Sequence, residues 1–178
     1  VALVAAVAGV AGADVKQTTT TTNPGTTAQK GKRISVDTPV SAFVPHAQIS
    51  QTLYMERCKG GCTVNKGGIN DARSMMSTIP EIQTSNIQEY KNGAGESGAA
   101  ADAEWAALMT CMKEVYSPFQ VNVTDVKPPA GISYHMAIVA GIPQDIGRGS
   151  DILGVAPLAN DCSPQDNVIS FSFANAHT

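Results

Sequence analysis

Residues 101–126 read ADAEWAALMTCMKEVYSPFQVNVTDV, and this stretch decides the fold class. Its large apolar side chains recur at steps of three or four residues, beginning one turn after an alanine, and the positions are Ala101, Trp105, Leu108, Met112 and Val115. This spacing predicts an amphipathic helix over residues 101–116 that packs against a sheet. The Ser-Pro pair at 117–118 ends the helix. Residues 121–124 alternate apolar and polar side chains, which predicts a strand with one solvated face directly after the helix.

Most of the remaining folded part is predicted to form strands. Residues 51–57 alternate weakly, and residues 134–140 are apolar on both faces, as in a central strand. Residues 152–157 end in proline, which suits an edge strand, and residues 167–174 form the last strand. Residues 63–100 are rich in turn-forming pairs and are predicted to be loops. The sequence therefore predicts an α/β fold with a mixed twisted sheet of about four to five strands and one main packed helix.

The composition divides the chain into three parts. Residues 1–13 are small and apolar and close on Ala-Gly-Ala, which is typical of a secretory signal, with a buried N-terminal helix as the alternative. Residues 14–35 include five consecutive threonines and almost no apolar side chains, which predicts a flexible linker. Residues 36–178 form the α/β domain. We expect the chain to be a fragment that begins inside its signal peptide and stops before the domain is complete.

Charge and hydropathy exclude two classes of protein. Twelve basic residues stand against fifteen acidic ones, without a basic cluster beyond residues 30–33, which argues against a nucleic-acid partner. No apolar run approaches the roughly 20 residues that span a bilayer, so we predict no membrane span. Only 15% of the residues are charged, and threonine, serine, asparagine and glutamine take their place. This composition favours a secreted, extracellular protein.

The four cysteines allow several interpretations. Cys58 and Cys62 are so close that, in an exported protein, a local disulfide is expected, and its small ring contributes about 2 kcal/mol to stability. A Cys-x-x-x-Cys zinc knuckle is the alternative, and it would need two further ligands. Cys111 lies near the apolar stripe of the helix and is predicted to be either a core thiol or a disulfide partner of Cys162.

The sequence shows no catalytic or metal-binding group. His46, His135 and His177 are too far apart for helical ligand spacing, and His135 is predicted to be an ordinary residue of a strand. The chain also lacks a Gly-x-Ser-x-Gly elbow, a phosphate-binding Gly-Lys-Ser/Thr loop and a dinucleotide fingerprint. We therefore assign no catalytic residue, metal ligand or cofactor to this chain.

Several strings follow one another in a specific order. CMKEVYSPF at 111–119 runs into VNVTDV at 121–126, and then come HMAIVAG at 135–141, GVAP at 154–157 and DCSP at 161–164. Together, over roughly residues 50–175, they resemble the N-terminal half of metzincin-type zinc metallopeptidases, particularly the secreted bacterial, reprolysin-like members. The resemblance implies that the fold is the upper subdomain of a zincin, left incomplete.

In that family the next element is a helix with His-Glu-x-x-His-x-x-Gly-x-x-His, whose histidines bind zinc and whose Glu deprotonates the zinc-bound water. This sequence does not contain that motif, and His177 is not followed by Glu. The resemblance thus implies a secreted zinc endopeptidase as the full-length parent, which hydrolyses peptide bonds with a zinc-activated water. We predict that this chain alone is inactive and that zinc belongs only to the parent.

The resemblance also implies where a peptide or protein substrate binds. In the family the edge strand of the sheet pairs with the extended substrate through backbone hydrogen bonds. The matching residues here are Ile152, Leu153, Gly154, Val155 and Ala156. An ordinary blunted edge is the alternative. A second class of function also stays open, namely a non-catalytic extracellular structural, filament or surface-layer module whose copies form a homo-oligomer by strand exchange.

Overall fold

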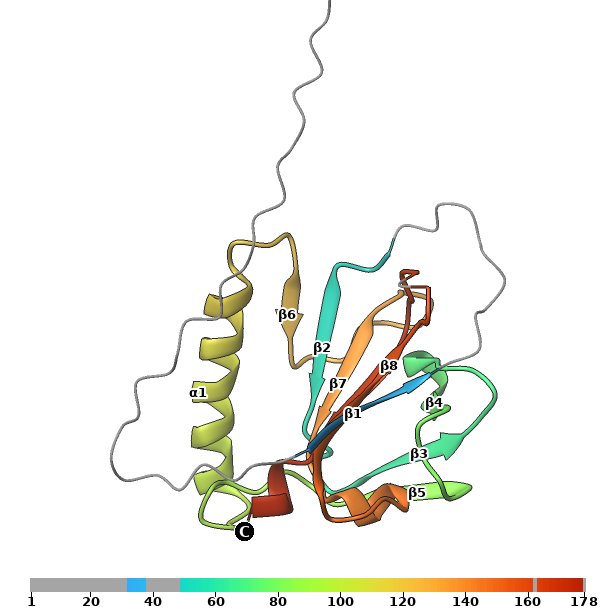
Figure 1. The fold of residues 1–178 in the computed structure, drawn as a ribbon. Coiled ribbons are helices and arrows are strands. Elements are labelled where there is room, and N and C mark those ends of the chain that lie inside the picture. Colours follow the sequence, from blue (N-terminus) through green and yellow to red (C-terminus); the bar gives the residue numbers. More distant parts are fainter. Residues whose placement is uncertain (1–31, 38–48, 162, 178) are drawn as a thin grey trace, which may run out of the picture.

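The computed structural model describes residues 32–37, 49–161 and 163–177, and for residues 32–37 and 177 the description is limited to the backbone. The large sheet consists of β1 (Lys32–Asp37), β2 (Thr52–Glu56), β6 (Asn122–Thr124), β7 (His135–Val139), β8 (Ile152–Leu158) and β9 (Ile169–Ser172). The small sheet consists of β3 (Cys62–Lys66), β4 (Met76–Ser77) and β5 (Thr84–Ile87). One α-helix, α1 (Ala99–Tyr116), and three short 3-10 helices, η1 (Ala72–Ser74), η2 (Pro143–Ile146) and η3 (Ala174–His177), complete the described elements (Figure 1).

The large sheet is mixed. Its strand order is β1-β8-β9-β7-β2-β6. Strands β6, β2, β7 and β9 run parallel to one another, β8 runs antiparallel to β9, and β1 runs parallel to β8. The predicted α/β fold with a mixed sheet and one main helix is confirmed. The small sheet, with the order β4-β3-β5, lies within residues 62–87, so the prediction that residues 63–100 are loops is wrong for these strands.

Strand β1 corrects two predictions. It pairs with β8 along its whole length, so residues 32–35, which were predicted to belong to the flexible linker, are part of the sheet. Because β1 covers the outer side of β8, the prediction that residues 152–156 form an edge strand is wrong. The pattern KRISVD alternates polar and apolar residues and could have indicated a strand. Its pairing partner lies more than a hundred residues away, and no local pattern reveals such a partner.

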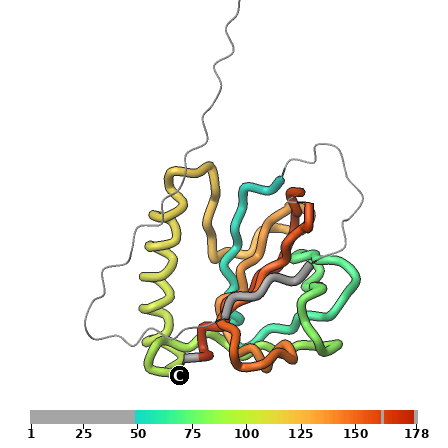
Figure 2. Tube along the Cα trace, in the orientation of Figure 1, coloured from blue at the N-terminus to red at the C-terminus, as the bar shows by residue number. Residues whose placement is uncertain are grey.

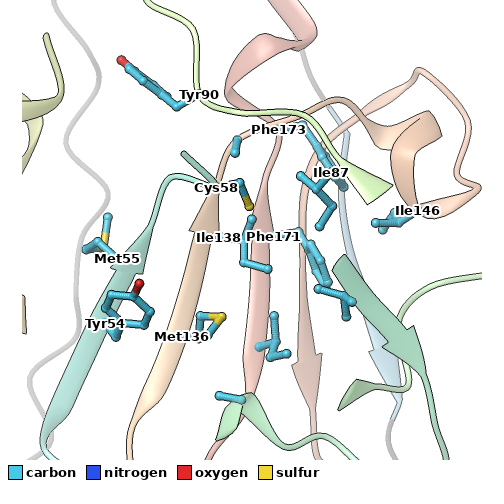
Figure 3. Packing of buried hydrophobic residues seen from close by; sticks show 14 of the residues in the cluster. Tyr54, Met55, Cys58, Ile87, Tyr90, Met136, Ile138, Ile146, Phe171 and Phe173 are labelled. Atoms are coloured by element: carbon cyan, nitrogen blue, oxygen red, sulfur yellow. The ribbon is translucent and has the colours of Figure 1, made fainter. Parts of the chain in front are cut away.

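The core lies on the face of the large sheet against which Tyr134 and the small sheet pack. Met136 and Ile138 of β7 are buried, as are Ile169 and Phe171 of β9, which stand beside them in register. Figure 3 shows Ile138 and Phe171 on neighbouring strands, with Ile87 of β5 near the same end of the sheet. Burial therefore alternates along β7 and β9, and this face joins the two sheets into one folded unit.

Helix α1 lies at the β6 end of the sheet (Figures 1 and 2). Its buried residues are Ala101, Trp105 and Met109, spaced by four residues, while Leu108 and Met112 are partly buried. The predicted stripe is thus correct for three of its large residues, but Val115 is 58% exposed. The buried line runs through Met109 because side chains four residues apart lie above one another on a helix. The indole Nε1 of Trp105 donates a hydrogen bond to Asp125 Oδ2 at 3.1 Å, which holds α1 to the segment after β6.

Candidate functional site

The strand that the sequence selects for peptide binding is β8. It pairs with β9 in antiparallel sense, with Gly154 opposite Ser172 and Val155 opposite Phe171. At the start of this ladder the amide of Phe173 donates a hydrogen bond to the carbonyl of Leu153 at 2.9 Å. Ile152 and Val155 are buried, which fastens β8 to the core. The backbone of β8 is consequently held in an extended conformation by its neighbour and by two anchoring side chains.

Gly154 lies against the backbone of β9. A Cβ atom at this position would lie 3.0 Å from the carbonyl oxygen of Phe171. Such a contact is shorter than ordinary van der Waals separation, so a larger residue would push the two strands apart. Glycine is the one residue that fits without displacing the neighbouring backbone.

The outer side of β8 is occupied by β1. Lys32 stands opposite Ile152 and Arg33 opposite Gly154, so that Leu153 is skipped in a bulge. From there the register is regular, and it reaches Asp37 opposite Leu158. The five residues that the resemblance assigns to substrate binding therefore lie between two strands, and no extended peptide can pair with them while β1 is in place.

At the end of β8 the surface has a shallow hollow of about 310 Å³. Its lining residues are Pro157, Leu158, Ala159, Ser163, Gln165 and Val168. Leu158 is half exposed, and the lining is mostly apolar.

Of the three histidines, His135 has a side chain that the structure describes. His135 is the first residue of β7, as predicted, and its Nε2 lies 3.8 Å from Asp166 Oδ1. The same carboxylate oxygen accepts hydrogen bonds from the amides of Ser50 and Asn167. His46 and the side chain of His177 lie outside the described residues. Among the side chains that are described, no group of three or more His, Cys, Asp or Glu residues could hold a metal ion. We assign no catalytic step to His135.

The cysteine predictions have mixed outcomes. Cys58 and Cys62 form the predicted disulfide, with their Cα atoms 4.9 Å apart, so neither thiol is available for a zinc knuckle. Cys111 is free and exposed, so both predictions for it, a core thiol and a bond to Cys162, are wrong. It follows Trp105 by six residues, which places it about 120° around α1 from Trp105 and away from the buried line. Cys162 itself lies outside the described residues.

A charged cluster that the sequence did not reveal joins the end of β2 to the start of α1. Arg57 Nη1 lies 2.6 Å from Asp102 Oδ1, and the guanidinium stands 5.7 Å from the ring centre of Trp105. The hydrogen bond from Arg57 lowers the pKa of Asp102. Because the two residues are 45 positions apart, no spacing in the sequence indicated the pair. The charges of Arg57 and Asp102 are paired, so the cluster fastens the start of α1 to the end of β2.

The same region holds the segment before α1. The hydroxyl of Tyr90 donates a hydrogen bond to Glu104 Oε1 at 2.8 Å, and the ring packs edge-on against Trp105. Burial, together with the bond to Glu104, raises the pKa of Tyr90 to about 12. Asn175 bridges the segment to η3, since its amide donates to the carbonyl of Glu89 and its Oδ1 accepts from the amide of Lys91. These contacts build the end of the sheet toward which β2, β7 and β9 run.

Over the part of the chain that the structure describes, no helix has both the length and the apolar character needed to cross a membrane.

Comparison with known proteins does not identify the chain. No protein-family model, no curated protein and no solved structure matches the chain.

Proposed function

We propose that this chain is the N-terminal portion of a secreted zinc-dependent endopeptidase of the metzincin type. The observation that carries the proposal is the order and sense of the elements. Helix α1 leads directly into β6, the parallel strand β7 follows, β8 then runs in the opposite direction, and β9 returns beside it. This is the order of strings on which the resemblance rests, from the helix at 111–119 to the Gly-containing strand and the loop with Cys162.

The position of β8 supports a peptide or protein as the substrate. An extended peptide can bind a strand by adding backbone hydrogen bonds on its outer side, whatever the peptide's side chains are. Strand β8 has only β1 beyond it, and its anchoring residues Ile152 and Val155 keep its backbone extended. The disulfide between Cys58 and Cys62 supports secretion, since disulfides persist in oxidising compartments.

The face of the sheet beside α1 supports a further element in the parent. Ala137 of β7 pairs in register with Ser170 of β9, and Val139 with Ser172. All four are half-buried or exposed, whereas the residues that alternate with them are buried in the core. Their small size would let a helix approach the sheet closely. The resemblance places the zinc-binding helix after the last strand, where it would cover this face.

The reading frame beyond the codon for Thr178 tests this proposal. We expect His-Glu-x-x-His within about thirty residues, a distance that allows a short loop and one helix. The extended protein should bind zinc, measured by mass spectrometry of the metal, and should cleave a quenched-fluorescent peptide library. Alanine at the first histidine of the motif should abolish zinc binding and cleavage together. A stop codon in place of the motif would contradict the proposal.

The pairing of β1 with β8 favours a second candidate function. A strand that reaches the sheet from a distant part of the sequence can also pair with the sheet of another copy, which is the basis of strand exchange. The chain would then be a non-catalytic extracellular module that forms homo-oligomers. Light scattering separates the two functions, because the module should show oligomers that grow with protein concentration.

A further inference from the structure

The strand on the outer side of β8 comes from the part of the sequence that precedes the rest of the described fold. Lys32–Asp37 pairs in parallel with Ile152–Leu158 over six register positions. In the strand order, β1 is the terminal strand and β8 is its neighbour. The backbone positions that an extended substrate would use are thus filled by another segment of the same chain.

We propose that the outer side of β8 is a peptide-accepting edge and that β1 is its built-in competitor, which must leave before an extended peptide can bind. The inference rests on the proposed function, because it concerns the strand at which the substrate would bind. It adds how access to that strand is regulated. It also adds that β1, the segment now bound there, runs parallel to β8.

The hydrogen-bonding groups of β8 explain why its outer side needs an occupant. The N–H and C=O groups of a strand alternate between its two neighbours, so half of those in β8 face away from β9. Without β1 they would form an open edge, which readily takes up another strand. Any segment that binds there uses the same groups, so β1 and a peptide exclude each other.

The structure also explains why β1 can be displaced while the rest of the sheet remains. Strand β1 has one neighbour, whereas β9, β7 and β2 each have two. Ordering its six residues costs roughly 1–2 kcal/mol per residue of backbone entropy, which one ladder must offset. The ladder is weakened by the bulge at Leu153, where the register shifts. Strands with such limited support open at a lower free energy than the central strands do.

Two consecutive prolines in β1 give a direct test in the full chain. In Ile34→Pro/Ser35→Pro, one of the two prolines removes an amide that faces β8, whichever phase the ladder has. The matched control is Ala28→Pro/Gln29→Pro, which lies before β1. We expect amide hydrogen exchange in residues 152–158 to accelerate at least about tenfold in the first variant and to stay unchanged in the control. Exchange in residues 135–139 should be unaffected in both, which shows that the fold is intact.

A fluorescent peptide with the sequence KGKRISVDT, from residues 30–38, then measures access to the vacated edge. When a competitor occupies a site about 99% of the time, its removal tightens the apparent Kd roughly hundredfold. We expect the β1 variant to bind the peptide at least about tenfold more tightly than the wild type or the control does. A peptide of the same composition in scrambled order should bind only weakly to all three. Equal affinity of the wild type and the β1 variant would overturn the proposal, as would unchanged exchange in residues 152–158.

The source of the competing strand is tested by dilution. If β1 belongs to the same chain, protection of residues 152–158 is independent of protein concentration. Protection that disappears on dilution, together with a change from dimer to monomer in light scattering, would overturn the assignment to the same chain. None of these measurements involves zinc or catalysis. Failure of the hydrogen-exchange and peptide-binding experiments on β8 is therefore distinguishable from failure of the endopeptidase proposal. The sequence downstream of Thr178 decides the latter.

Discussion

Gly154 is the residue whose size controls the contact between β8 and β9. Substitution by alanine places a Cβ atom 3.0 Å from the carbonyl oxygen of Phe171, which the backbone must relieve by moving. We expect Gly154→Ala to lower the free energy of unfolding by about 1–3 kcal/mol, as overpacking does. Urea denaturation measures this change. A Cβ atom at Gly68 would meet no heavy atom within 4 Å. Gly68→Ala should therefore be neutral or stabilising by less than about 1 kcal/mol. Equal stability of the two variants would show that the close contact is absent.

Tyr90 couples the stability of the fold to alkaline pH. Its pKa is raised from 10.0 to about 12, first by burial and then by its hydrogen bond to Glu104. Between these two pH values the unfolded chain loses the phenolic proton while the folded chain keeps it, so stability should fall as pH rises through this window. Urea denaturation at several pH values measures the slope. In Tyr90→Phe the slope should be reduced, and Glu104→Gln should bring the pKa of Tyr90 closer to 10. An unchanged slope in Tyr90→Phe would contradict this assignment.

At the scale of elements, the rotation of α1 about its axis decides which residues stabilise the fold. Met109 is buried and Val115 is 58% exposed, although both are apolar residues of the same helix. We expect Met109→Ala to lower the free energy of unfolding by about 2–5 kcal/mol, because it leaves a cavity beside the sheet. Val115→Ala should change it by no more than about 0.5 kcal/mol. Thermal and urea denaturation of the two variants compare these effects, and a larger loss for Val115→Ala would reverse the orientation of α1.

Strand β1 is the element that links the fold to the proposed regulation. The strands with two neighbours share a core face, whereas β1 depends on a single ladder to β8. This difference in support is the reason that we place the exchangeable part of the sheet at β1. Stability should therefore vary across the sheet and be lower at β1 than at the strands with two neighbours.

At the scale of the whole molecule, we expect the isolated chain to have no tight zinc site. The described side chains bring no three His, Cys, Asp or Glu residues together, and Cys58 is oxidised in a disulfide with Cys62. Calorimetric titration of the chain with zinc should show no binding in the submicromolar range. The same titration of the extended protein with His-Glu-x-x-His is the control and should show tight binding. A submicromolar site in the isolated chain would contradict the assignment of zinc to the parent alone.

The accuracy of the sequence predictions follows the range of the interactions behind them. Residues 101–116 repeat apolar side chains with helical spacing, and the helix is found there with its start two residues earlier. The disulfide between Cys58 and Cys62 closes a ring of five residues, which proximity in the sequence makes probable without any tertiary contact. Residues 134–140 were predicted as a central strand from their apolar character, and β7, at residues 135–139, has two neighbours in the sheet. In each case the prediction depends on residues that are near one another in the sequence.

The candidate site was predictable only in part. The sequence located a strand at residues 152–157, and β8 is found there. Its neighbours were not predictable, because a strand pattern reports which faces are apolar and not which distant segment completes the hydrogen bonds. The edge assignment failed for this reason. The charged cluster of Arg57 and Asp102 was missed for the same reason, since the two residues meet only after β2 and α1 have packed.

The sequence by itself determined that this protein has one amphipathic helix, a set of strands, a local disulfide and no evident catalytic motif, because these depend on neighbouring residues and on spacing. The tertiary structure alone decided that β1 covers β8, that Cys111 faces away from the core and that the sheet has a half-covered face beside α1. Those features depend on contacts between segments far apart in the chain, and their free energy is gained only when the strands have assembled.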